Sequence, residues 1–121
     1  MKAEIEDWLK KAKNELNAAK YNFDGKQYEV AAFLCQQAAE KALKAFYVKK
    51  FKKLWKIHDL KMLAVELKAP EHIVELAINL NPAYIASRYP SMNVNYKASD
   101  VKELIIDAQQ VIEWVEKSLL R

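Results

Sequence analysis

Glycine and proline are almost absent from this chain, which has one glycine and three prolines in 121 residues. Sandwiches and barrels of β-strands need many tight turns, and such turns depend on residues of these two kinds. Apolar residues recur instead at spacings of three and four along most of the chain, a pattern typical of helices with one buried face. The sequence therefore predicts an all-α fold in a single domain that spans residues 1–121.

Four long helices and one short helix are expected, joined by connections short enough to favour an up-and-down bundle. Alanine is frequent in the second helix. Small side chains allow helices to approach closely, so this helix is expected at the centre. Caps, glycine and proline set the boundaries. The first helix ends at Asp24-Gly25, the second covers about 26–48, and the short helix follows Asp59. The fourth helix runs from Pro70 to Tyr89 with an interruption at Asn81-Pro82. The last helix follows Ser99 as its N-cap.

Several classes of protein are excluded by composition. The longest apolar run, Val30–Cys35, is far shorter than the roughly 18 residues that a membrane span requires. Acidic residues at positions 4, 6 and 7 stand where the apolar part of a signal peptide would lie, so we expect a cytoplasmic protein with no membrane partner. One cysteine, two separated histidines and one glycine supply neither metal-ligand spacing nor a glycine-rich phosphate loop, so no metal and no cofactor are expected.

Lysine is concentrated in one segment. Eight lysines and a single acid lie between residues 41 and 61, and aromatic residues are interleaved with them. Cations mixed with aromatic rings are typical of surfaces that bind nucleotides or single-stranded nucleic acid. We therefore consider Lys49, Lys50, Lys53 and Trp55 as candidate ligand contacts. The alternative is a solvated helix end whose aromatic side chains pack inward.

A set of motifs along the chain resembles a known family. The second helix reads Gln36-Gln37-Ala38-Ala39-Glu40-Lys41-Ala42-Leu43-Lys44-Ala45, Trp8 precedes it, and His58-Asp59-Leu60 and Arg88-Tyr89-Pro90 follow. In this order and at these distances, the residues resemble the HEPN domain (higher eukaryotes and prokaryotes nucleotide-binding) over essentially the whole chain. The resemblance implies an up-and-down helical bundle that is usually a homodimer.

Two kinds of function follow from this resemblance. Many HEPN proteins are metal-independent endoribonucleases, often toxins, whose motif is an arginine and a histidine separated by four to six residues. Others resemble non-catalytic companions that bind a nucleotide, RNA or substrate for a separately encoded minimal nucleotidyltransferase, in modules of the toxin–antitoxin type. The two classes overlap, because that nucleotidyltransferase often serves as the antitoxin.

The ribonuclease motif is incomplete in this sequence. Arg88 matches its arginine, which would hold phosphate as charge builds up, but the positions for the histidine hold Asn93, Val94 and Asn95. The amide of Asn93 cannot exchange a proton near neutral pH, and His58, far upstream, is the remaining candidate for the base. We therefore expect a binding subunit without catalytic activity. The alternative is an endoribonuclease with a modified site made of Arg88, His58 and Asn93.

Arg88 and two tyrosines are the remaining candidate ligand contacts. Arg88 is the only arginine inside the chain, and a planar guanidinium binds phosphate through two atoms where lysine offers a point charge. A structural pairing with Glu40 or Glu103 is the alternative for Arg88. Tyr89 and Tyr96 flank the loop that follows and are candidates for stacking on a base, with packing at the rim of the core as the alternative.

Overall fold

The structure, a computed structural model, describes residues 2–89 and 95–121, with the backbone alone for Ser87 and Arg88. These residues form helices and no strand, which confirms the predicted all-α class. The helices are α1 (Lys2–Asp24), α2 (Tyr28–Phe51), α3 (Leu60–Glu66), α4 (Glu71–Leu80), α5 (Pro82–Arg88) and α6 (Ala98–Leu119).

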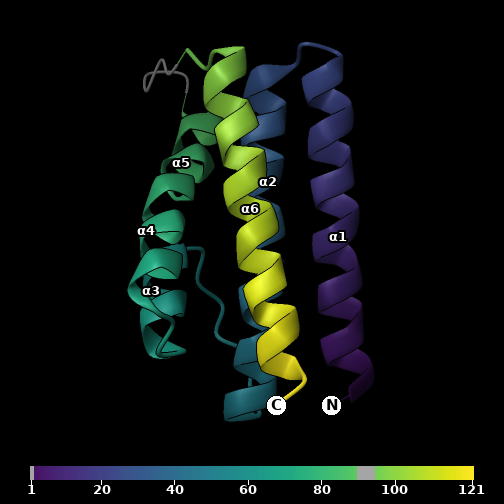
Figure 1. The fold of residues 1–121 in the computed structure, drawn as a ribbon, viewed down its shortest axis with the longest axis vertical. Coiled ribbons are helices and arrows are strands. Elements are labelled where there is room, and N and C mark those ends of the chain that lie inside the picture. The colour runs from purple at the N-terminus through teal and green to yellow at the C-terminus, as the bar shows by residue number, and fades with distance from the viewer. Residues whose placement is uncertain (1, 90–94) are drawn as a thin grey trace.

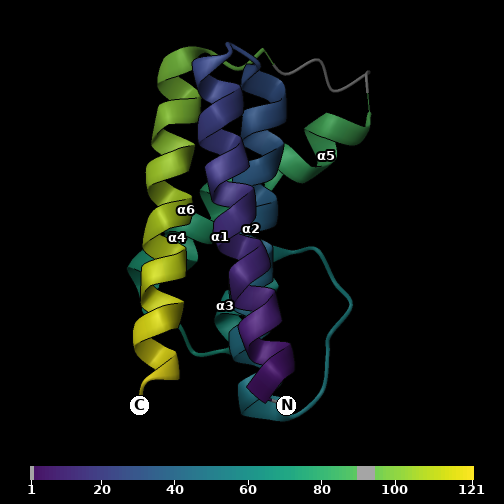
Figure 2. The ribbon, with the colours of Figure 1, turned by 90° about the vertical axis from the view of Figure 1, so that its right-hand side faces the viewer.

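Three long helices run along the longest axis, and three short ones form the fourth arm of the bundle. Figures 1 and 2 show α1, α2 and α6 side by side, with α3, α4 and α5 on one flank of α2 and α6. Successive arms run in alternating directions, as predicted for an up-and-down bundle. The α2 helix contacts each of the other five helices, and its alanines are buried, which confirms its predicted central position. These buried alanines are Ala31, Ala32, Ala38, Ala39, Ala42 and Ala45.

The fourth arm is divided where the sequence predicted an interruption. The α4 helix ends at Leu80 and α5 begins at Pro82, because proline has no N–H to donate to the preceding turn. At the start of this arm, the side chain of Asp59 accepts a hydrogen bond of 3.1 Å from the backbone N–H of Met62. Asp59 is therefore the N-cap of α3, as predicted.

The start of the last helix differs from the prediction. The helix begins at Ala98, with Lys97 at the N-cap, and not after Ser99. The carboxylate of Asp100 accepts a hydrogen bond of 3.0 Å from the backbone N–H of Lys97. An acid at the third helical position can satisfy the donor at the N-cap in this way, so the assignment of Ser99 as the cap was wrong.

Three helices are followed by a lysine in the left-handed conformation, which is unusual because glycine is the common residue there. The φ angles are 63° at Lys26, 60° at Lys52 and 57° at Lys68. After α1, the glycine that was expected to end the helix stands one position earlier, and Lys26 takes the left-handed position. Scarcity of glycine in this chain therefore places strain at helix ends.

No helix among the described residues is long and apolar enough to cross a membrane.

Candidate functional site

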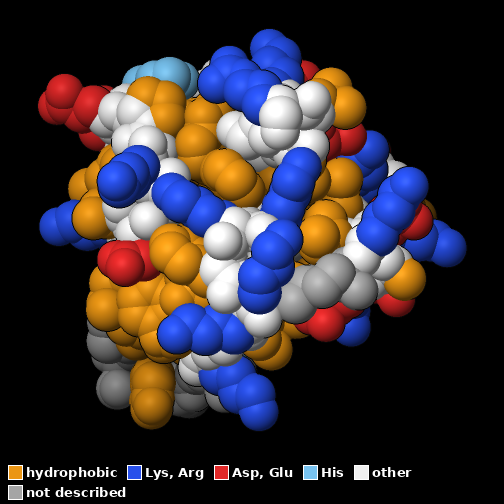
Figure 3. Space-filling view, turned by 90° about the horizontal axis from the view of Figure 1, so that it is seen from below, with side chains coloured by type: hydrophobic (Ala, Val, Ile, Leu, Met, Phe, Trp, Pro, Cys, Tyr) orange, Lys and Arg blue, Asp and Glu red, His pale blue; other side chains and the backbone are white. Residues whose placement is uncertain are grey.

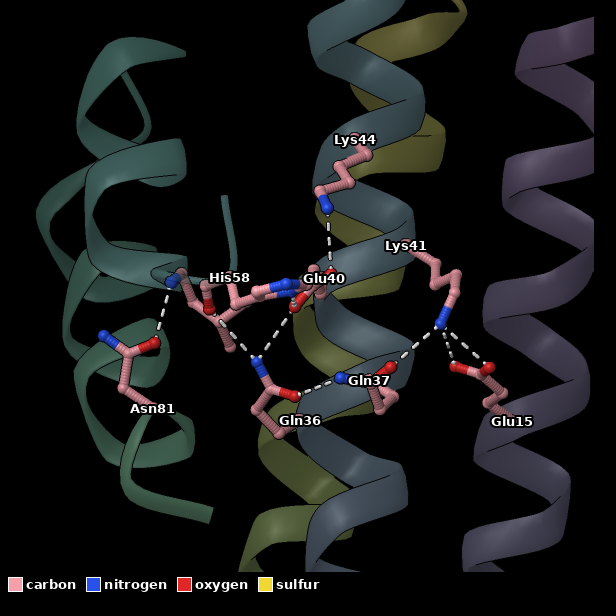
Figure 4. A network of polar contacts seen from close by, with 9 residues as sticks. Glu15, Gln36, Gln37, Glu40, Lys41, Lys44, His58 and Asn81 are labelled. Carbon is pink, nitrogen blue, oxygen red and sulfur yellow. Dashed lines mark hydrogen bonds and ion pairs between the residues drawn. The ribbon is translucent and has the colours of Figure 1, made fainter. Parts of the chain in front are cut away.

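A buried polar cluster lies inside the bundle and is centred on Glu40 (Figure 4). Gln36, Glu40 and Lys44 follow one another at intervals of four along α2, so they share one helix face. The Lys44 ammonium lies 2.9 Å from Oε2 of Glu40, and Nε2 of Gln36 donates to Oε1 of Glu40 at 3.2 Å. The same ammonium lies 6.0 Å from the ring centroid of Trp8, within the range of a cation–π contact. Both charges are buried, and each is the other's direct partner.

His58 completes this cluster from the connection between α2 and α3. Its Nδ1 lies 3.2 Å and 3.1 Å from the two carboxylate oxygens of Glu40, and its carbonyl accepts a 3.2 Å hydrogen bond from Gln36. A carboxylate only accepts, so Nδ1 of His58 carries the proton that is donated. The Glu40 side chain is 4% exposed and that of His58 is 49% exposed. A buried carboxylate therefore orients a ring whose other side faces solvent.

The same imidazole stacks on a tyrosine of α5. The ring centroids of His58 and Tyr84 are 4.6 Å apart with 19° between the planes. Phe33 of α2 lies 6.5 Å from Tyr84 with 25° between those planes. Arg88 is the last residue of α5, one helical turn after Tyr84. The fold thus brings His58, 30 positions upstream in the sequence, close to the helix that ends in Arg88.

A second group of hydrogen bonds holds the start of α3 against the break between α4 and α5. Oδ1 of Asn81 accepts from the backbone N–H of Leu60 at 2.7 Å, and Nδ2 of Asn81 donates to Asp59 at 3.0 Å. Partial burial alone would raise the pKa of Asp59, but hydrogen bonds from Asn81 and from the Met62 backbone, with the nearby charge of Lys61, lower it overall. Asn81 was expected only as a helix interruption, and no local signal marked it as a partner of residues 59 and 60.

An outer branch connects the cluster to α1 (Figure 4). Nε2 of Gln37 donates to the amide oxygen of Gln36 at 2.7 Å, and the Lys41 ammonium lies 3.1 Å from Oε1 of Gln37. Lys41 also pairs with both carboxylate oxygens of Glu15, at 2.9 Å and 3.0 Å. The polar residues of the α2 motif therefore join α1, α2 and the α2–α3 connection in one network.

The predicted basic and aromatic segment lies around the C-terminal end of α2, at the end of the bundle where α6 also ends (Figure 1). The ammonium of Lys49 donates to the Leu119 carbonyl, and that of Lys50 lies 3.5 Å from the Leu67 carbonyl. Trp55 is half-buried, with its ring centroid 5.5 Å from that of Tyr47. This packing favours the alternative interpretation for Trp55, a ring turned toward the core. Lys53 is exposed.

The other predicted contacts lie near the end of α5 and the start of α6, so the candidate residues fall into two separate regions. Tyr89 is 56% exposed, and Asn93 lies outside the described residues. Tyr96 is half-buried beside a pocket of about 420 Å³ that also holds Asp100, Glu103 and Asp107. Burial and the negative charges of Glu29 and Asp100 raise the pKa of Tyr96. Negative surroundings disfavour a phosphate next to Tyr96.

Two other groups have perturbed pKa values for reasons of burial. Burial raises the pKa of Cys35 to about 12, with a smaller contribution from the charge of Asp107. Burial and the charge of Glu103 raise the pKa of Asp107, although a hydrogen bond from Asn79 acts in the opposite direction. The described residues contain no group of three histidine, cysteine or acidic side chains arranged to hold a metal ion.

Comparison with known proteins identifies the family. The sequence model of the HEPN domain matches residues 5–118, nearly the whole chain. The chain belongs to the HEPN family. The polar residues of the motif that suggested this family, from Gln36 to His58-Asp59, build the polar network, and Trp8 covers the Lys44 ammonium. In this HEPN chain the part of the motif from Trp8 to His58-Asp59 is thus structural, and the imidazole of His58 is the exposed side chain within that part.

Three solved structures have the same fold along nearly their full length. TT1696 from Thermus thermophilus is 30% identical with a TM-score of 0.88, and the alignment covers 94% of this chain and 97% of that one. ST0689, described as an archaeal HEPN homologue, is 32% identical with a TM-score of 0.82 and coverage of 95% and 97%. The HEPN domain protein tm0613 from Thermotoga maritima is 25% identical with a TM-score of 0.77 and coverage of 95% and 98%. No curated protein shows significant similarity to this chain.

Proposed function

We propose that this HEPN chain is a non-catalytic cytoplasmic subunit that binds a nucleotide or RNA and works with a separately encoded minimal nucleotidyltransferase. The observation that carries the proposal is the exposed imidazole of His58, held at Nδ1 by the buried Glu40 and stacked on Tyr84, one turn before Arg88. An imidazolium in this position donates from Nε2 to a phosphate oxygen while Nδ1 stays bonded to Glu40, and the ring can stack on a base. The guanidinium of Arg88 supplies the bidentate phosphate contact.

The chemistry of the site supports binding more than cleavage. Attack by the 2′-hydroxyl of RNA requires one group to accept a proton and another to deliver one to the leaving oxygen. His58 is the one histidine near α5 among the described residues, since His72 lies on α4 in its first turn. Asn93, at the position of the family's histidine, cannot exchange protons near neutral pH. A single imidazole at the site therefore suits recognition of a phosphate ligand.

We propose further that two copies of the chain form a homodimer through the surface next to this site. Two apolar side chains near the end of α5, Ile85 and Tyr89, are about half exposed. Exposed apolar groups that follow one another on one element are typical of interaction surfaces. Sedimentation analysis is expected to give a dimer for the wild type and a monomer for Ile85→Glu. A monomeric wild type at micromolar concentration would contradict this arrangement.

The binding proposal is tested by fluorescence anisotropy with labelled single-stranded RNA and by calorimetry with ATP. His58→Ala and Arg88→Ala are each expected to weaken binding by at least about tenfold, the loss expected for a hydrogen bond to a charged group. Lys20→Ala, an exposed lysine of α1, is the matched control and is expected to leave binding unchanged. Wild-type protein that binds neither RNA, ATP nor a coexpressed nucleotidyltransferase would refute the proposal.

An endoribonuclease is the second candidate, because of the Glu40–His58 pair. A carboxylate that fixes Nδ1 of a histidine leaves Nε2 available as a general base, and Nε2 of His58 has no hydrogen bond to the described residues. The test is a time course of end-labelled RNA in EDTA. If the wild type cleaves RNA and both Arg88→Ala and His58→Ala abolish cleavage, the endoribonuclease replaces the binding proposal. Intact RNA at high protein concentration would support the binding proposal.

A further inference from the structure

An apolar groove lies at the end of the bundle where α1 begins and where α2 and α6 end. Its volume is about 630 Å³, and its apolar lining comes from Ile5 and Leu9 of α1 and from Leu119 and Leu120 at the end of α6. Leu120 is 88% exposed, although it is a large aliphatic residue. A groove of this size with an aliphatic lining is within the range of small-molecule binding sites.

The charged residues that line this groove are three lysines and two acids, so their net charge is positive. The side chains of Lys2, Lys49 and Lys52 line it, and within the described part of the chain none of the three lies within ion-pair distance of a carboxylate. Lys49 donates to the neutral carbonyl of Leu119. Two acids, Glu6 and Glu116, also line the groove. Glu116 is paired with Lys13 at 2.6 Å, so the three lysines face one acid, Glu6, that has no ion pair among the described residues. Figure 3, which looks onto this end, shows lysine and arginine side chains around patches of apolar side chains.

The combination of lining and charge indicates the chemical class of the occupant. An aliphatic groove without an aromatic ring offers no stacking surface for a base, so a nucleotide is a poor match. Ammonium groups that are not paired with a carboxylate attract an anion, and the leucine and isoleucine side chains favour a hydrocarbon chain. We propose that this groove binds a single-chain fatty carboxylate, with the acyl chain between α1 and the end of α6. The carboxylate then lies next to Lys2 and Lys52. This site is separate from the one that contains His58.

Calorimetry with purified full-length protein tests the proposal, with decanoate and dodecanoate below the concentrations at which they form micelles. Each additional buried methylene contributes about 0.8 kcal/mol, so dodecanoate is expected to bind about fifteenfold more tightly than decanoate. Dodecanol is expected to bind at least about tenfold more weakly than dodecanoate, and dodecyltrimethylammonium is expected not to bind. Equal affinity for the anionic and cationic amphiphiles would overturn the proposal, because the lysines would then have no role.

Two substitutions at exposed positions locate the site. Lys52→Glu reverses a charge at the rim and Leu120→Glu places a charge in the apolar part, and each is expected to weaken dodecanoate binding at least about tenfold. Lys20→Glu, at an exposed position near the other end of α1, is the matched control and is expected to bind normally. Circular dichroism verifies that all three variants are folded. Unchanged affinity in both groove variants, or no binding by the wild type, would overturn the assignment. His58→Ala is expected to bind dodecanoate normally, which separates this test from that of the proposed function.

Discussion

Lysines at two places on α2 have the same chemistry in the sequence and opposite environments in the structure. Lys44 is buried, with its ammonium 2.9 Å from the Glu40 carboxylate and over the ring of Trp8. Lys49 and Lys50, one to two turns later, donate to the carbonyls at the ends of α6 and α3. A buried charge needs a partner of opposite charge, whereas a charge near solvent does not. A count of lysines therefore does not reveal which of them can bind a ligand.

The cluster around Glu40 and the end of α2 differ in the partners of their charged groups. Around Glu40, the carboxylate oxygens are shared among Lys44, His58 and Gln36. None of the buried side-chain polar atoms of the described residues is left without a hydrogen bond. At the end of α2, positive charge lies beside neutral carbonyls and an apolar groove. We therefore expect substitutions in the first region to change the free energy of unfolding, and substitutions in the second to change ligand binding.

The largest effect is expected from breaking the buried ion pair on one side. Lys44→Met leaves Glu40 without its cation, and Glu40→Gln leaves Lys44 without its anion, so each is expected to lower the free energy of unfolding by about 3–5 kcal/mol. The double variant is expected to recover much of this loss, because neither charge then remains buried and unpaired. Urea unfolding measures all three proteins. Single variants within about 1 kcal/mol of the wild type would show that solvent reaches this cluster.

A smaller effect is expected at the border of the network, where Asp59 caps α3 and bonds to Asn81. Asp59→Ala is expected to lower the free energy of unfolding by about 1–2 kcal/mol at pH 7. The pKa of Asp59 is lower in the folded chain than its usual value of 3.8. Its contribution is therefore complete above pH 3.8 and is lost as pH falls through the lower folded value. Thermal unfolding at pH 7 and at pH 2 is expected to show a difference between wild type and variant that shrinks at the lower pH. A difference that grows on acidification would contradict this account.

A lysine at the end of α3 tests backbone strain without any role for its ammonium. Lys68 has a φ of 57°, and the N–H groups of Lys68 and Ala69 close the end of the helix on the carbonyls of Val65 and Ala64. Lys68→Gly removes the steric clash of the side chain with the backbone but gives the unfolded chain more conformational freedom. The net effect expected is an increase of about 0.5 kcal/mol in the free energy of unfolding. Lys68→Ala keeps the strain and is expected to change little. Urea unfolding of the wild type and the two variants tests this expectation. A Lys68→Gly variant less stable than the wild type would argue against strain at this position.

The smallest effect on stability is expected just after the end of α2, at Lys53. Lys53→Met is expected to leave the free energy of unfolding within about 0.5 kcal/mol of the wild type, because the side chain is exposed and has no partner among the described residues. This substitution is chemically identical to Lys44→Met, nine positions earlier. A loss at Lys53 comparable with that at Lys44 would remove the distinction between the two regions.

Local signals predicted most of the fold. Spacings of three and four, with almost no glycine, are sufficient for an all-helical chain, since amphipathic helices bury one face by their own periodicity. Asp59 marks the start of α3 because its side chain accepts a hydrogen bond from a nearby backbone N–H. Asn81-Pro82 marks the break between α4 and α5 because proline has no N–H to donate. The cap at Ser99 was wrong because Asp100 satisfies the donor of Lys97. Ser99 and Asp100 follow one another, and sequence spacing alone does not show that Asp100, at the third helical position, bonds back to Lys97 at the cap.

The roles of the polar side chains depended on contacts between distant parts of the chain. Their spacing places Gln36, Glu40 and Lys44 on one face of α2, and this was readable from the sequence. That His58 returns to Glu40 from 18 positions away, and that Trp55 packs inward, follows from the path of the α2–α3 connection (Figure 2). Helix formation is a local property, but the burial of a charge depends on which distant surface covers it. The sequence by itself therefore determined the helices and the family, and the tertiary structure decided which charged and aromatic side chains remain open to a ligand.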